Sequence, residues 1–231
     1  MRILCTICAK KNSAGLRNKN IKPLNKIPLV SRAITQAKKS NIFDNIVIST
    51  DSKKIIILSK KLKIETWFLR PNDLCKNDTA KTDVILHALK ESEKFYKKKY
   101  DIIIDLDVTA PLRSILDIKN ALNKFKKNKL EILFSVCESK KNPYFNMVEK
   151  INGKLKMVKI GKNINSRQLA PKVYDVNAAI YIWSRNALLR KKSFFSKKTD
   201  FYVMPRIRSV DIDDKNDWDL VNFYIKKNNN D

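Results

Sequence analysis

A polar loop near the N-terminus carries residue types suited to binding a chain of phosphates. The apolar run of residues 3–9 gives way to Lys10, and Ser13, Gly15, Lys19 and Asn20 follow. Glycine tolerates a positive φ that lets backbone amides point toward one anion, and lysines supply point charges for phosphate oxygens. The Gly-Lys-Ser/Thr sequence of triphosphatase loops and the three-glycine dinucleotide pattern are both absent. Taken alone, the loop is equally consistent with a solvated surface turn.

Two acidic residues near the C-terminus have the spacing of a cation site. Asp211 and Asp213 end the apolar stretch 207–212, for which we predict a short strand, so both side chains project from one face. Paired carboxylates are typical ligands of Mg²⁺, which bridges phosphate oxygens and acidifies an attacking hydroxyl. Asp211 is then the best candidate for the proton acceptor. The alternative is a solvated acidic cap on a final helix.

A second acidic pair, Asp105 and Asp107, follows the same spacing at the end of the apolar run 102–106. Ligands of open α/β sheets gather at the carboxyl ends of strands. Asp107 therefore accepts hydrogen bonds from a substrate or helps to hold a second magnesium ion, and the sequence does not decide between them. A structural role for Asp105 is at least as well supported as a functional one.

These residues are set in an alternation of apolar, strand-like runs and amphipathic, helix-like segments. Nearly continuous apolar strands indicate a mostly parallel sheet that helices cover on both faces. We predict a Rossmann-like α/β fold, with residues 1–231 forming a single domain. The expected strands are 3–9, 46–50, 64–69, 102–106, 132–137 and 174–183, and the expected helices are 30–39, 54–62, 84–96, 115–125 and 215–226.

The alternation stops between residues 139 and 172. There Asn152-Gly153 separates two apolar-alternating runs, 147–151 and 155–160, which predicts a β-hairpin. We therefore expect an arm or insertion at 139–172.

Composition excludes several classes of protein. The formal net charge of +26 would ordinarily suggest nucleic acid. The lysines are dispersed, however, and abundant lysine, asparagine and isoleucine with only 3 glycines fit an AT-rich coding bias. We expect no specific nucleic-acid partner, although the charge attracts anionic substrates. His87 is the only histidine, which excludes a metal site with several histidine ligands, and the 4 cysteines lack the spacing of a zinc site. No apolar run reaches membrane-span length, so we expect a cytoplasmic protein without a membrane partner.

Several further segments, in this order, carry a family resemblance. They are Pro28-Leu29-Val30, residues 46–52, Arg70-Pro71 with Asp78-Thr79-Ala80, residues 109–113, and residues 209–213. With the N-terminal loop they resemble the acylneuraminate cytidylyltransferases, which include the CMP-sialic acid synthetases and related CMP-nonulosonic acid synthetases. The resemblance covers about residues 3–219. One departure is Ala9-Lys10, where the family has Ala-Arg.

The resemblance implies a Mg²⁺-dependent transfer of CMP from CTP to a nine-carbon acidic sugar, with release of pyrophosphate. It implies a fold of the nucleotide-diphospho-sugar transferase type and a homodimer whose hairpin arm crosses to the partner. Lys10 and Lys19 would wrap the triphosphate as catalytic cations. The implied nucleotide-binding residues are Ser13, Gly15, Asn20, Arg70, Asp78, Thr79 and Thr82.

The same resemblance implies a sugar-binding set. Asp107 stands where sialic acid enzymes place a glutamine that faces the sugar, and Phe145 stands where some of them have a lysine, so the pocket differs from theirs. Arg113 either pairs with an interior carboxylate or buttresses its loop. Phe194-Phe195 matches an aromatic pair that borders the acyl group. The full set is Asp107, Arg113, Arg167, Gln168, Tyr174, Asn177, Phe194 and Phe195.

The sequence does not identify the acceptor among sialic, legionaminic and pseudaminic acids. A nucleotidylyltransferase for an eight-carbon keto-acid sugar is the first alternative. A basic nucleic-acid-binding protein is the second, and it rests on charge alone.

Overall fold

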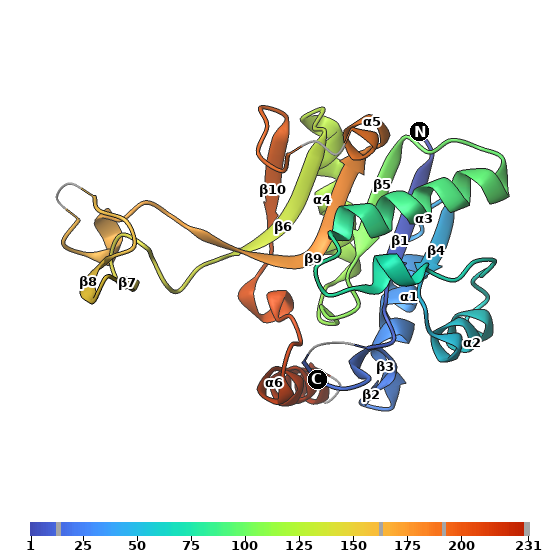
Figure 1. The fold of residues 1–231 in the computed structure, drawn as a ribbon, viewed down its shortest axis with the longest axis horizontal. Coiled ribbons are helices and arrows are strands. Elements are labelled where there is room, and N and C mark those ends of the chain that lie inside the picture. The colour runs from blue at the N-terminus through green and yellow to red at the C-terminus, as the bar shows by residue number, and fades with distance from the viewer. Residues whose placement is uncertain (13–14, 162–163, 191–192, 229–231) are drawn as a thin grey trace.

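A six-stranded sheet forms the centre of the computed structural model, which describes residues 1–12, 15–161, 164–190 and 193–228 (Figure 1). The strand order is β10-β6-β9-β5-β1-β4. The strands are β1 (Ile3–Cys8), β4 (Asn45–Ser49), β5 (Ile102–Leu106), β6 (Ile132–Glu138), β9 (Tyr174–Ser184) and β10 (Thr199–Val203). A short pair, β2 (Pro23–Leu24) and β3 (Ile27–Pro28), lies beside the sheet.

The sheet is mostly parallel, as predicted. β1 pairs in parallel with β4 and β5, and β10 pairs in parallel with β6. β9 is the exception, because it is antiparallel to both of its neighbours, β5 and β6. Parallel neighbouring strands require a crossover connection. The chain instead leaves the sheet at the end of β6, passes through the arm and returns as β9 beside β6, so β9 runs in the opposite direction.

Helices cover both faces of the sheet, also as predicted. They are α1 (Leu29–Ser40), α2 (Lys53–Lys61), α3 (Lys81–Tyr96), α4 (Ile115–Lys127), α5 (Arg185–Leu189) and α6 (Lys215–Asn228). The core is split accordingly: one cluster joins alternate strand residues to α1, α4 and α6, and the other joins the intervening residues to α3 and α5. No helix in the described ranges is long and apolar enough to cross a membrane.

Two expected strands are wrong. Residues 64–69 form no strand, and β4 remains the outermost strand at this edge of the sheet. The segment meets the chain beyond β4 through a backbone hydrogen bond from Arg70 N to Thr50 O, at 2.8 Å, instead of through a ladder of bonds. Residues 207–212 form the 3₁₀-helix Arg206–Ser209 and an extended tail, because the sheet edge beside β6 is already occupied by β10. Strand β10 and helix α5 were not anticipated.

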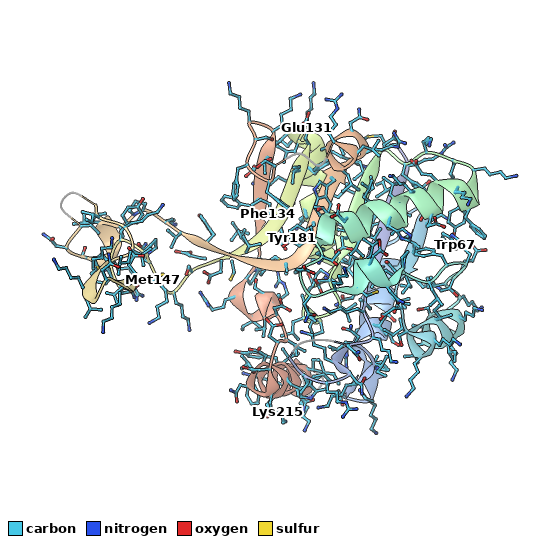
Figure 2. All side chains as sticks on the ribbon, viewed as in Figure 1. Trp67, Glu131, Phe134, Met147, Tyr181 and Lys215 are labelled. Atoms are coloured by element: carbon cyan, nitrogen blue, oxygen red, sulfur yellow. The ribbon has the colours of Figure 1, made fainter. Side chains whose placement is uncertain are left out.

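The predicted hairpin is present as β7 (Val148–Ile151) and β8 (Lys154–Met157). Asn152 and Gly153 have φ values of 50° and 80°, the left-handed conformations that a tight two-residue turn requires. The hairpin stands at the end of a long arm that continues β6 and β9 away from the sheet, and Met147 lies far from the body of the molecule (Figures 1 and 2).

The loop after β1 docks against the segment that precedes α6. Leu16 N donates to Asp213 O at 3.2 Å, and a Cβ on Gly15 would lie 2.0 Å from that same oxygen. Glycine is required at position 15 because this carbonyl approaches closely, and in the same loop Asn18 takes the left-handed conformation at φ 56°. Ser13 lies outside the described residues.

We expect Gly15→Ala to separate this loop from residue 213. Overpacking of this kind costs about 1–3 kcal/mol of unfolding free energy. Urea unfolding measures that cost, and hydrogen exchange should show faster exchange of the Leu16 amide. Gly153→Ala is the control, because it strains a distant turn and should leave the Leu16 amide unchanged. Equal protection of that amide in Gly15→Ala and the native protein would contradict the docking contact.

Candidate active site

A cavity of about 320 Å³ lies at the carboxyl ends of β1 and β5. Its position follows from the topology, because the loops after these two strands diverge there. The lining residues are Cys8, Lys10, Gly15, Lys19, Asn20, Arg70, Leu74, Lys76, Asn77, Thr79, Lys81, Val84, Asp107, Thr109 and Asp213. Of the sequence-predicted nucleotide set, the structure thus brings Gly15, Asn20, Arg70 and Thr79 together with Lys10 and Lys19.

Cations gather on one side of the cavity. Lys19 is buried, and its Nζ donates to Ile212 O at 2.6 Å and to Asp213 Oδ1 at 3.0 Å. Arg70 is buried and donates to Ser49 O at 2.6 Å. Lys10 Nζ has a neutral partner, Asn77 Oδ1 at 2.7 Å, so its charge is not compensated by that contact. This side of the cavity suits an anion.

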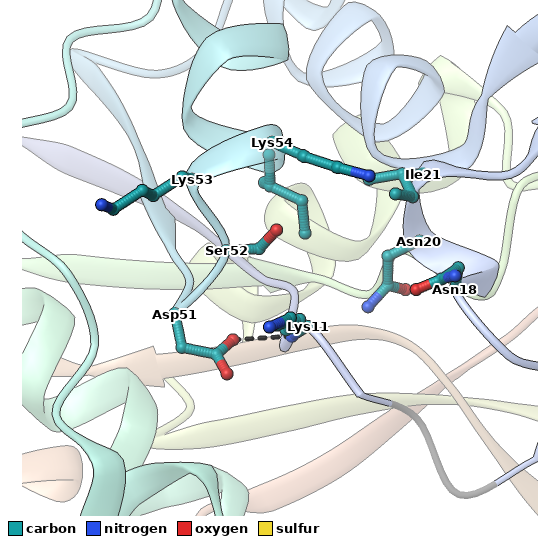
Figure 3. Close-up of a pocket in the computed structure, with 9 residues that line it drawn as sticks. Lys11, Asn18, Asn20, Ile21, Asp51, Ser52, Lys53 and Lys54 are labelled. Carbon is teal, nitrogen blue, oxygen red and sulfur yellow. Dashed lines mark hydrogen bonds between the residues drawn. The ribbon is translucent and has the colours of Figure 1, made fainter.

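Asn20 lies between this cavity and a second one. Its Nδ2 donates to Lys10 O at 2.9 Å, which fixes the start of the loop. The second cavity, of about 350 Å³, is bounded by Lys11, Asp51 and the first turn of α2 (Figure 3). Lys11 N donates to Asp51 Oδ1 at 2.6 Å, drawn as the dashed line in Figure 3, and this bond ties the loop to the end of β4.

Two carboxylates and a lysine form an ionic cluster at the same cavity. Asp105 is fully buried; it accepts from Thr6 Oγ1 at 2.7 Å, and its Oδ2 lies 2.9 Å from Lys81 Nζ. Lys81 Nζ also contacts Asp107 Oδ2 at 2.5 Å. Burial favours the neutral form of Lys81, yet the two carboxylates raise its pKa well above the ordinary value. Burial raises the pKa of Asp107, but the positive charge of Lys81 and the hydrogen bonds from Lys81 and Thr109 together have the larger opposite effect and lower that pKa to about 2.

Arg113 lies behind this cluster. It is 2% exposed and donates to the backbone carbonyls of Asp107 and Ala179 at 3.1 and 2.5 Å, and to Gln36 Oε1 at 2.9 Å. Burial lowers its pKa to about 10. The sequence left open whether Arg113 pairs with an interior carboxylate or supports its own loop. Its contacts with two backbone carbonyls and an amide oxygen match the second role.

Asp211 stands next to the cluster and carries an unsatisfied atom. Its Oδ1 is buried and accepts no hydrogen bond within the described ranges. Burial, and then the charge of Asp107, raises the pKa of Asp211 to about 6. Asp213, by contrast, is exposed and paired with Lys19. The two carboxylates therefore do not share one strand face, because the segment is not a strand.

An aromatic cavity of about 220 Å³ adjoins the ionic cluster. It is lined by Phe134, Val176, Tyr181, Phe194 and Phe195. Phe134 and Tyr181 pair across β6 and β9 (Figure 2). Lys81 Nζ, which lines the central cavity, lies 4.9 Å from the Tyr181 ring centroid. The predicted pair Phe194-Phe195 thus shares one wall, with Phe195 85% exposed.

The remaining predicted residues lie elsewhere. Asn177 is buried and bonds to Ser135 and Ser209, and the Tyr174 ring packs against Phe201 at 4.7 Å. Arg167 lines a separate cavity of about 590 Å³ at the base of the arm, and Gln168 is exposed in the same 3₁₀-helix. Asp78 and Thr82 flank the start of α3 but do not line the central cavity.

Lys81 was missed by the sequence analysis. It directly follows Asp78-Thr79-Ala80, a segment that was identified, and it is the first residue of α3. A helix N-terminus disfavours a cation, so a lysine there indicates a nearby carboxylate, which was the available signal.

Comparisons with known proteins show the family to which this chain belongs. Residues 4–223 match the family model described as cytidylyltransferase. The chain is 44% identical over 227 residues to the CMP-N,N'-diacetyllegionaminic acid synthase of Campylobacter jejuni, covering 98% of this chain and 96% of that protein. It is 42% identical, with the same coverage, to the post-translational flagellin modification protein B of Campylobacter coli.

A solved structure supports the fold. The CMP:2-keto-3-deoxy-manno-octonic acid synthetase complexed with CTP superposes with a TM-score of 0.70 at 12% identity, covering 99% of this chain and 100% of that one. At this identity the likeness concerns the fold alone. With the family match over nearly the whole length, the resemblance inferred from the sequence is confirmed: the chain belongs to the cytidylyltransferase family of CTP-dependent nucleotidyltransferases.

Proposed function

We propose that this protein transfers CMP from CTP to a nonulosonic acid bearing N-acyl groups, of the legionaminic type, and releases pyrophosphate. The observation that carries the proposal is a single cavity lined both by Lys10, Lys19 and Arg70 and by the ion pair Lys81–Asp107. Lys81 also lies beside the Tyr181 ring of an aromatic cavity. The relative named as a CMP-N,N'-diacetyllegionaminic acid synthase supports this acceptor class. CTP as co-substrate supports a cytoplasmic location.

In the proposed reaction the acceptor hydroxyl attacks the α-phosphate of CTP. Lys10, Lys19 and Arg70 hold the triphosphate and stabilise the charge of the leaving pyrophosphate. Asp211 takes the proton of the attacking hydroxyl, and its pKa of about 6 leaves it ionised and basic at neutral pH. Thr79 and Asn20 complete the nucleotide side of the cavity.

Asp211 also fits a magnesium ion. Its buried Oδ1 lacks a donor, and an unsatisfied carboxylate oxygen is a hard ligand for this cation. The described residues contain no group of three or more potential ligands, so triphosphate oxygens must complete the coordination. Bound Mg²⁺ supplies charge neutralisation and orientation of the phosphates. Asp213 is the second proposed ligand, and it would have to leave Lys19 to take part.

The acceptor is tested by product analysis. Purified protein is incubated with CTP, Mg²⁺ and a panel of sialic, legionaminic, pseudaminic and eight-carbon keto acids, and CMP-sugars are identified by mass spectrometry. We expect the diacetylated legionaminic acid to give the highest kcat/KM. Preference for the eight-carbon acid would establish the alternative enzyme. Absence of any CMP-sugar together with strongly salt-dependent nucleic-acid binding would support the non-enzymatic reading.

We expect Asp211→Asn to reduce transfer by at least about 100-fold, since it removes both a proton acceptor and a charged ligand. Thermal unfolding should stay near that of the native protein. Mn²⁺ binding to the enzyme–CTP complex, followed by electron paramagnetic resonance, should weaken. Asp214→Asn is the control, because Asp214 is exposed and its Oδ1 accepts from Asp217 N at 3.0 Å, a bond that asparagine can also accept. Near-normal activity with unchanged Mn²⁺ binding would contradict the role of Asp211.

We propose further that residues 139–172 form a dimerisation arm of a single cytidylyltransferase domain. Apolar side chains on the arm are exposed in the single chain: Val148 is 66%, Leu155 73% and Ile160 88% exposed. Contacts with a second copy across an isologous interface would bury them. Arg167 and Gln168, which lie far from the central cavity of their own chain, would then brace the partner's site.

Sedimentation at low micromolar concentration tests the arm. We expect a dimer, and we expect Leu155→Glu to shift it toward monomer and to lower activity in parallel. Ile57→Glu is the matched control, since Ile57 is a 55% exposed apolar residue on α2, away from the arm. A fully active monomer of the native protein would overturn both the dimer and the shared-site proposal.

A further inference from the structure

The second cavity, beside α2, has no role in the proposed transfer of CMP. Its volume of about 350 Å³ lies in the range of small-molecule sites, roughly 300–1,000 Å³. It shares Asn20 with the central cavity, and the rest of its lining comes from other residues of the loop after β1, the end of β4 and the first turn of α2 (Figure 3). A ligand bound there would therefore be separate from the nucleotide.

Ser52 presents a hydroxyl group to this cavity. It is 6% exposed and stands at the N-cap position of α2, but its side chain forms no capping hydrogen bond. In the part of the chain that the structure describes, Ser52 Oγ has no other hydrogen-bond partner either. Figure 3 shows the hydroxyl directed across the cavity, toward Asn20 and Ile21. Since a buried polar group without a partner is costly, this hydroxyl indicates a ligand atom in the cavity.

The first backbone amides of α2 are available to the same ligand. Ile56 N donates to Ser52 O at 3.1 Å and closes the first turn. The three preceding amides, those of Lys53, Lys54 and Ile55, donate to no other described residue. Such amides, together with the helix dipole, favour an anion at a helix N-terminus. A phosphate group can accept from these amides and from the serine hydroxyl at once.

The charged residues of the lining also favour an anion. Lys11, Lys53 and Lys54 line the cavity with one carboxylate, that of Asp51. Asp51 Oδ1 accepts from Lys11 N at 2.6 Å, so this carboxylate already serves to hold the loop. Three lysines outweigh one carboxylate, and the net charge of the lining is positive.

Two isoleucines give the cavity an apolar wall. Ile21 and Ile55 line it, and Ile55 is 1% exposed. A bare phosphate ion gains nothing from such a wall, whereas an organic group bonded to the phosphate removes the wall from water. Asn18 adds a side-chain amide that can hydrogen-bond to a hydroxyl of that group. The lining therefore fits a phosphate ester of a small polar molecule better than inorganic phosphate.

We propose that the second cavity is a binding site for a phosphomonoester, separate from the nucleotide cavity and occupied independently of it. The phosphate oxygens accept from the Ser52 hydroxyl and from the first amides of α2, and the organic group lies against Ile21 and Ile55. This site goes beyond the proposed function and does not depend on which acid accepts CMP.

Two substitutions of Ser52 separate ligand binding from stability. Ser52→Ala should leave the Tm unchanged, because the hydroxyl has no partner in the described chain, and should weaken phosphate binding about tenfold, as expected for one lost hydrogen bond to a charged group. Ser52→Asp should raise the Tm, because aspartate is a good N-cap, and should abolish binding by charge repulsion. Lys60→Met is the control, because Lys60 is exposed in the last turn of the same helix.

Binding is measured by NMR on isotope-labelled protein that is saturated with CTP and Mg²⁺ in the absence of an acceptor, so that the central cavity is filled. Glycerol phosphate and inorganic phosphate are titrated separately, and the amide shifts of Lys54 and Ile55 are followed. We expect saturable shifts, tighter binding of glycerol phosphate, and equal affinities for the native protein and Lys60→Met.

Four outcomes would overturn the proposal. A lower Tm of Ser52→Ala with unchanged phosphate affinity would assign the hydroxyl to helix capping. Shifts that do not saturate and spread over the surface lysines would show an adventitious ion only. Shifts of Lys54 and Ile55 by CTP alone, as large as those of Thr79 in the central cavity, would make both cavities one nucleotide site. Equal affinity for the two phosphates would remove the assignment to a monoester.

Discussion

The buried carboxylate of Asp105 is the constraint on which the arrangement of the site depends. A charge at zero exposure in the centre of a sheet costs several kcal/mol unless it is paired and hydrogen-bonded. Thr6 from β1 and Lys81 from α3 provide both, so the pairing links the two strands at the sheet centre to the start of the helix that covers them. Asp107 and Thr109 follow β5 directly, and their geometry is fixed by the same cluster.

The same cavity also receives cations. Lys10 and Lys19 reach it from the loop after β1, and Arg70 reaches it from the segment that follows α2. Burial, and then the charge of Asp107, raises the pKa of Asp211, whereas at Asp107 the charge of Lys81 and the hydrogen bonds from Lys81 and Thr109 together outweigh burial and lower the pKa. Two neighbouring carboxylates thus acquire different properties: Asp107 is an ionised acceptor, and Asp211 is able to exchange a proton near neutral pH.

Much of the fold could be predicted from periodicity, because buried parallel strands and amphipathic helices leave strong local patterns. The patterns failed where pairing decides the outcome: residues 64–69 and 207–212 are apolar enough for strands, but no sheet edge receives them. The loop residues Lys10, Lys19, Asn20 and Arg70 were recognised because they lie in motifs. Lys81 was not, because in a lysine-rich chain a single lysine carries little information until the topology places it beside two carboxylates. The need for glycine at position 15 was evident, but its cause, a carbonyl almost two hundred residues away, is visible only in the folded chain.

The arm and the acceptor side of the site share the same two strands. β6 contributes Phe134 and β9 contributes Tyr181 to the aromatic cavity, and both strands leave the sheet together to form the arm. Between these regions the pairing is interrupted by a register shift, where Ala178 takes a φ of 52°, an unfavourable conformation for a residue with a Cβ. The bonds of Asn177 to Ser135 and Ser209 hold this irregular segment in place. The arm is therefore continuous with strands that are anchored immediately beside Tyr181, whereas Lys10 and Lys19 follow β1 and lie on a part of the sheet that the arm does not extend.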